Sequence, residues 1–173
     1  MGIWKSQNIT WDDITVPFTQ SKQGVNLKPD FDYTNLGLLF PNNNTAELVD
    51  IIVQFPHNRK AGTNIRPHIH FVQSVASTPT FKMSYRWYDN GASAIPSFTT
   101  ITATTFAFTY TSGSILQIAL FPEINGSAIV GLSSMMDVKV YRDDATVTGD
   151  VLVKEFDIHY QLDSNGSSQE YRK

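Results

Sequence analysis

The stretch Asn-Ile-Arg-Pro-His-Ile-His-Phe-Val-Gln, residues 64–73, alternates apolar and polar side chains. Successive side chains of a β-strand point to opposite faces, so this alternation predicts a strand with one face in a core. The apolar face would carry Ile65, Pro67, Ile69 and Phe71, and the opposite face Arg66, His68 and His70. Two of the four histidines of the chain would thus lie side by side behind a core strand.

Further runs of β-branched and aromatic residues follow the same pattern and are separated by Gly, Pro and Asn turns. These runs are 48–55, 81–89, 97–110, 115–121, 128–132, 135–141 and 151–162. The run 115–121 is almost wholly apolar, which predicts a strand buried on both faces. Because no segment carries a sustained helical stripe, we predict an all-β fold, an antiparallel β-sandwich or jelly roll.

The sequence suggests three parts: an N-terminal arm (1–45), a β-sandwich domain (46–162) and a polar C-terminal tail (163–173). Large apolar side chains are spread through the arm without a regular period, so they need a surface to cover them. That surface is either the chain's own domain or a neighbouring subunit. The expected docking residues are Trp4, Trp11, Phe18, Phe31 and Phe40 of the arm and Tyr171 of the tail.

Composition excludes several classes of function. The net charge of −3 and the absence of a Lys/Arg cluster argue against nucleic-acid binding. With no cysteine there is no disulfide, thiolate nucleophile or thiolate-bound metal. No apolar run approaches the roughly 20 residues of a membrane span, and the N-terminus lacks a signal-peptide pattern. We therefore expect a soluble protein that does not act at a membrane.

His68-Ile69-His70 is the strongest candidate for chemistry, because two histidines at i and i+2 on a strand suit two ligands of one metal ion. With Gly62 the stretch fits Gly-x5-His-x-His, the opening of the first cupin motif. The carboxylate that this motif expects next is missing from 71–75, and so is a second histidine motif. We therefore favour a structural role for the two histidines, in which their imidazoles pack against Arg66, carboxylates or a second subunit. A metalloenzyme is the alternative.

The other two histidines, His159 and His57, could also belong to a metalloenzyme site. Asp157 or Glu155 would share a strand face with His159 and could orient it as a general base. If that strand pairs with the histidine strand, His159, His68 and His70 converge, and His57 could join them. Adjacent carboxylates at 12–13 predict a solvated loop, and the serines at 133–134 a turn. Aromatic residues, Trp87 and Tyr88 among them, leave a carbohydrate-binding module as a third possibility.

Several strings resemble a family of small virion proteins of tailed bacteriophages. The strings, in order, are Gln54-x-Pro-His57, Pro67-His68-x-His70, Tyr85-Arg86-Trp87-Tyr88-x-Asn90-Gly91, Phe121-Pro122-Glu123-Ile124, Tyr141-Arg142-Asp143 and Phe156-Asp157-x-His159-Tyr160. The likeness covers residues from about 10 to 173.

The resemblance implies a non-enzymatic virion component, assembled in the cytoplasm of a bacterial host. We expect a homo-oligomer, such as a trimer, on the capsid surface (as decoration or head fibre) or in the portal–collar–tail region. Its partners would be major capsid, portal or tail proteins. We expect no cofactor, except for a structural metal ion shared by His57, His68, His70 and His159.

Overall fold

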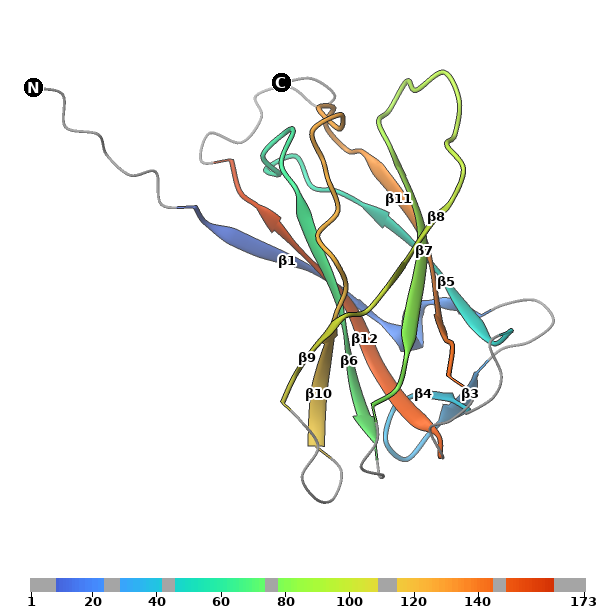
Figure 1. Ribbon diagram of the computed structural model, residues 1–173. Helices are drawn as coiled ribbons and strands as arrows, with labels where there is room; N and C mark the ends of the chain where they lie inside the picture. Colours follow the sequence, from blue (N-terminus) through green and yellow to red (C-terminus); the bar gives the residue numbers. More distant parts are fainter. Residues whose placement is uncertain are drawn as a thin grey trace, which may run out of the picture.

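A computed structural model of the chain describes residues 9–23, 29–41, 46–73, 78–108, 115–144 and 149–163. These residues form two antiparallel sheets packed face to face (Figure 1). The predicted all-β sandwich is therefore confirmed, while a jelly-roll connection of its strands stays a prediction. Apart from the strands, the described part of the chain holds one short 3-10 helix, η1 (Phe18–Gln20). No described helix has the length and apolarity to cross a membrane.

One sheet has seven strands and the other five. The seven-stranded sheet has the order β3 (Asp30–Asp32), β4 (Gly37–Phe40), β12 (Val151–Gln161), β6 (Ile65–Gln73), β10 (Ile115–Leu120) and β9 (Thr105–Ala107), with β1 (Trp11–Pro17) also paired to β12. The five-stranded sheet has the order β2 (Lys22–Gln23), β5 (Leu48–Gln54), β11 (Met135–Arg142), β7 (Phe81–Tyr88) and β8 (Thr99–Thr102).

The core lies between the two sheets and is built from alternate residues of each strand. The histidine strand is β6, and its predicted apolar face is buried in this core. On β6 Phe71 meets Phe81 of β7 with ring centroids 5.1 Å apart, so an edge-to-face aromatic pair joins the sheets. The polar face of β6 consequently points away from the core, onto the outer surface of the seven-stranded sheet.

The N-terminal segment contributes strands to both sheets. β1 pairs along most of β12, and β2 pairs with β5 of the other sheet. Phe18 and Phe40 are fully buried in the chain's own core and contact each other edge to face at 6.0 Å. The expectation that these two side chains dock on a neighbouring subunit is therefore corrected, because the sandwich itself covers them.

Two expected strands differ from the structure. Residues 128–132 form turns rather than a strand. The strand β10 is not buried on both faces, because the side chain of Leu116 is 50% exposed. An apolar run cannot distinguish a strand buried on both sides from one that presents apolar residues outward.

β12 contains a bulge that changes which of its residues face the core. Val153 lies opposite Phe71 and Glu155 opposite His70, so Lys154 is an extra residue in the ladder. Strict alternation along 151–162 would put Leu152 on the same face as Phe156 and Ile158. Because of the bulge it lies on the outer face instead, where it pairs with Val72.

Candidate functional site

The outer face of the seven-stranded sheet brings histidines and carboxylates together. β12 runs beside β6 with Asp157 opposite His68 and Glu155 opposite His70. Residues directly opposite each other in an antiparallel pair point to the same face. The bulge at Lys154 sets this register, since without it the carboxylates would meet different residues of β6.

Asp157 is shared by two imidazoles. Its Oδ2 lies 3.0 Å from Nε2 of His70 and 3.4 Å from Nε2 of His68. The two imidazole rings are 5.1 Å apart, centroid to centroid. One nitrogen from each histidine and one oxygen from Asp157 all lie within 4.8 Å of one another. Two nitrogens and one oxygen in this arrangement suit a divalent transition-metal ion.

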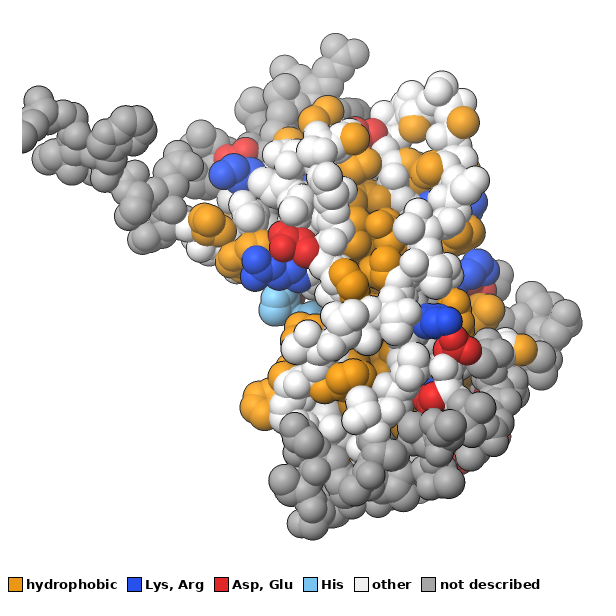
Figure 2. All heavy atoms as spheres, in the orientation of Figure 1, with side chains coloured by type: hydrophobic (Ala, Val, Ile, Leu, Met, Phe, Trp, Pro, Cys, Tyr) orange, Lys and Arg blue, Asp and Glu red, His pale blue; other side chains and the backbone are white. Residues whose placement is uncertain are grey.

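Neighbouring side chains on the same face cover most of this cluster. His68 is 3% exposed and Asp157 6% exposed, whereas His70 and Glu155 are partly open to solvent. Figure 2 shows histidine side chains at the surface beside a basic and an acidic group. Within the described residues, His68 Nδ1, His70 Nδ1 and Asp157 Oδ1 are buried without a hydrogen-bond partner.

The electrostatics of the cluster favour an ionised Asp157. Burial by itself raises the pKa of this carboxyl, but the hydrogen bond from His68 and contributions from Thr15 and His70 outweigh it. The pKa of Asp157 is therefore below its ordinary value, and a buried negative charge persists beside two imidazoles.

His159 joins the cluster from the other side of His68. Its ring packs edge to face on that of His68 at 4.5 Å, and its Nε2 lies 2.9 Å from Oδ1 of Asp13. Burial lowers the pKa of His159, although Asp13 partly opposes this, so the imidazole favours its neutral form. The carboxylate paired with His159 is therefore that of Asp13 rather than the expected Asp157 or Glu155.

His57 lies apart from the other three histidines. It follows β5 of the opposite sheet, and its Nε2 is 2.5 Å from Oγ of Ser133. Three of the four predicted site histidines thus meet on one face, and the fourth does not. Ser133 has φ 54° and is buried, in a turn as predicted, and among the described residues no carboxylate hydrogen-bonds to His57.

Asp157 and Asp13 complete the site in roles that the sequence did not predict. The carboxylate absent from 71–75 is supplied by Asp157 of the adjacent strand, which a local motif cannot reveal. Asp12 and Asp13 do not belong to a solvated loop. They lie in β1 and point to opposite faces, where Asp13 contacts His159 and Asp12 accepts a hydrogen bond from Tyr160.

The remaining expected interface residues lie in different surroundings. The guanidinium of Arg66 stacks over the ring of Trp11 at 4.5 Å, and Phe31 packs edge to face on Tyr33 at 4.7 Å. Both Trp11 and Phe31 are half-buried. Trp4 and Tyr171 lie outside the described residues.

Trp87, expected to stack on a sugar in the carbohydrate-binding alternative, is buried. It is 8% exposed and donates a hydrogen bond from Nε1 to Ser134 Oγ at 3.1 Å. A buried indole cannot stack on a ligand, so the expectation that Trp87 contacts a sugar is wrong.

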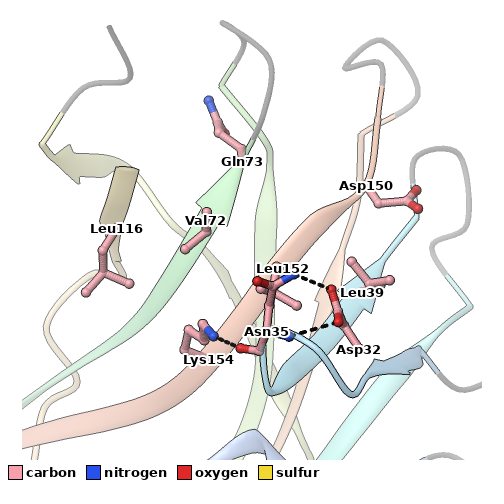
Figure 3. A pocket seen from close by; sticks show the side chains of 9 residues that line it. All are labelled: Asp32, Asn35, Leu39, Val72, Gln73, Leu116, Asp150, Leu152 and Lys154. Atoms are coloured by element: carbon pink, nitrogen blue, oxygen red, sulfur yellow. Dashed lines mark hydrogen bonds between the residues drawn. The ribbon is translucent and has the colours of Figure 1, made fainter. Parts of the chain in front are cut away.

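A groove of about 560 Å³ lies on the same outer face, near the bulge (Figure 3). Four apolar residues from four neighbouring strands pair across it in a row. They are Leu39, Leu152, Val72 and Leu116. At the rim Asp32 accepts hydrogen bonds from Asn35, which hold its pKa below the ordinary value, and Lys154 donates to the Asn35 carbonyl. The outer face thus combines an apolar row with a histidine–carboxylate cluster.

Comparison with known proteins gave no sequence match and structural matches of low TM-score. No protein-family model and no curated protein matches the sequence. Among solved structures, the chain is similar to dimeric latent PorU from Porphyromonas gingivalis, with 14% identity and a TM-score of 0.38. That match covers 90% of this chain and 13% of PorU. Eiger TNF from S. frugiperda is similar at 7% identity and a TM-score of 0.26, over 76% of this chain and 94% of Eiger.

Proposed function

We propose that the protein is a structural component of a bacteriophage virion, a homo-oligomeric sandwich that acts by packing its outer sheet face against other subunits. The sequence strings described above suggest the virion. The single structural observation that supports packing is the contrast between the outer faces of the two sheets.

The five-stranded sheet presents a face suited to solvent. Ion pairs cross its strands, with Lys139 Nζ 2.8 Å from Asp50 Oδ1 and Arg86 Nε 2.6 Å from Asp137 Oδ2. Lys82 pairs with Asp143 beside them. Opposite charges on neighbouring strands stabilise a sheet surface modestly and keep it soluble. Charged pairs thus dominate this face, although Ile52 of β5 is 70% exposed on it.

The seven-stranded sheet presents the apolar row instead. Leu116 is half exposed and Val72 partly exposed, in a groove whose rim is polar. Covering such side chains contributes roughly 1.5–3 kcal/mol for each one fully buried. Repeated by symmetry in an oligomer, a few such contacts per subunit suffice to hold an assembly.

A mass-spectrometric inventory of purified phage particles tests the virion proposal. We expect peptides of this chain in intact particles at a fixed ratio to the major capsid protein, and chemical cross-links from the groove to other virion subunits. Failure to find the chain in particles from a phage that encodes and expresses it would overturn the proposal.

A metal-dependent enzyme is the second candidate, and the cluster of His68, His70 and Asp157 is the observation that favours it. Two histidines and one carboxylate with open positions are the ligand set of non-haem iron oxygenases. None of these three side chains lines the groove near the bulge, and the partly exposed His70 is where a substrate would approach the cluster. Oxygen consumption by iron-loaded protein with a substrate library would support this candidate.

A further inference from the structure

We infer that His68, His70 and Asp157 bind a divalent transition-metal ion, with Glu155 as a fourth ligand, and that the ion fastens β6 to β12. This inference does not depend on the virion proposal, because it rests only on the cluster. The donor set of two imidazoles and carboxylates suits Zn²⁺, Co²⁺, Mn²⁺ or Fe²⁺.

Two distances in the cluster match those between ligands of one ion, and all three donor atoms lie within 4.8 Å of one another. A metal–ligand distance of about 2.1 Å places two ligand atoms roughly 3.0 Å apart at a right angle and roughly 3.4 Å apart at the tetrahedral angle. The separations of Asp157 Oδ2 from the His70 and His68 Nε2 atoms are 3.0 and 3.4 Å. Small rotations of three side chains would therefore place their donor atoms around one ion.

Hydrogen bonds within the cluster do not give every buried polar atom a partner. If both imidazoles donate from Nε2 to the same oxygen of Asp157, both Nδ1 lone pairs remain buried and unpartnered, and so does Asp157 Oδ1. Leaving a buried polar atom unpartnered typically costs about 1–3 kcal/mol. An ion bound by the two Nε2 atoms lets Asp157 coordinate through Oδ1 as well, so this buried carboxylate oxygen gains a partner, while each Nδ1 then carries the imidazole proton.

The charge around the cluster attracts a cation. Asp157, Glu155 and Asp13 supply three carboxylates on this face, and Arg66 is paired with Glu123 at 3.8 Å. Glu155 follows the bulge, and its Oε1 lies 4.0 Å from His70 Nε2. Since Glu155 is partly exposed, its carboxylate is free to turn toward an ion held by the other three residues.

Binding of Co²⁺ tests the site, because the visible spectrum of this ion reports coordination by nitrogen and oxygen. We expect metal-free protein to bind one Co²⁺ per chain, with a visible absorption band, and Zn²⁺ to displace it. The variants His70→Gln and Asp157→Asn keep the size of each side chain. In both we expect the affinity to fall by more than the roughly 10–100-fold that loss of an outer partner costs a metal site.

His57→Gln is the matched control, since His57 is the histidine outside the cluster. It should bind Co²⁺ like the unaltered protein, and circular dichroism checks that each variant is folded. Absence of Co²⁺ and Zn²⁺ binding by the unaltered protein would overturn the inference. Unchanged affinity in folded His70→Gln and Asp157→Asn would overturn it too.

Discussion

Arg142 is a buried cation that forms an ion pair and hydrogen bonds inside the sandwich. Its guanidinium forms two 2.8 Å bonds to the carboxylate of Asp144 and donates to the carbonyls of Phe40 and Gly149. The side chain is 1% exposed. It therefore links the end of β11 to β4 and to the segment before β12. A neutral side chain of another shape cannot make these four bonds.

We predict that Arg142→Ala lowers the free energy of unfolding by about 3–5 kcal/mol, because Asp144 would keep a buried charge without its partner. Lys139→Ala is the control. It removes a half-exposed ion pair to Asp50, which should cost only about 0.2–1 kcal/mol. Urea unfolding of both variants measures the difference. Equal losses in the two variants would contradict the prediction.

Tyr160 is a residue whose ionisation should report the pairing of β1 with β12. Burial, together with the hydrogen bond to Asp12 at 2.9 Å, raises its pKa to about 12. The unfolded chain has the ordinary value of about 10. The folded protein thus holds the phenol proton more tightly, so this contribution to stability is complete below pH 10 and is lost as the pH rises toward 12.

Spectrophotometric titration of the tyrosines measures this effect. We expect Tyr160 to ionise late in the unaltered protein, as do Tyr85 and Tyr88, whose pKa values burial also raises. In Asp12→Asn we expect a lower pKa of Tyr160 alone, because the neighbouring negative charge is gone. Burial remains in that variant, so the pKa should stay above 10. A titration curve that Asp12→Asn leaves unchanged would show that Asp12 does not act on this phenol.

At the scale of elements, alternation predicted most of the strands that form the core. In β5, β6, β7 and β11 the expected apolar faces are the buried ones. The candidate site was harder to predict because it depends on register. His68 and His70 were evident from the sequence. The carboxylate facing them is fixed by the pairing of β12 with β6 and by one extra residue, Lys154, and neither feature leaves a local signal.

The strands of the N-terminal segment were also hard to predict from the sequence. Its apolar residues lack a period because they belong to short strands in two different sheets and to η1 between them. From sequence it suggested an arm separate from the β-sandwich domain. In the structure its strands flank β12 and β5, and its residues Phe18 and Phe40 lie in the core.

We accordingly predict that deletion of residues 1–40 unfolds the protein. Single substitutions refine this test. Phe18→Ala should cost about 3–5 kcal/mol, because it opens a cavity beside Phe40. Tyr33→Ala, at a position 84% exposed in the same segment, should change stability by no more than about 0.5 kcal/mol. Thermal unfolding distinguishes the two, and a cooperative transition in the 1–40 deletion would contradict the prediction.

At the scale of the whole molecule, the sandwich has two unlike outer faces. One carries cross-strand ion pairs, and the other carries the apolar row and the histidine–carboxylate cluster on adjoining strands. Both faces contain an exposed aliphatic residue on a strand, Ile52 on β5 and Leu116 on β10. If the protein assembles through the seven-stranded sheet, these two residues should respond differently to the same substitution.

We predict that Leu116→Lys dissociates the proposed homo-oligomer and that Ile52→Lys does not. Lysine in the groove would place an unpaired charge inside an apolar contact, whereas at Ile52, 70% exposed beside Asp50 and Asp137, it would stay solvated. Light scattering coupled to size-exclusion chromatography gives the molar mass of each variant. Neither substitution touches the core, so both variants should unfold at similar temperatures. A loss of mass in Ile52→Lys alone would assign the interface to the five-stranded sheet, and a monomeric unaltered protein would remove the proposed mode of assembly.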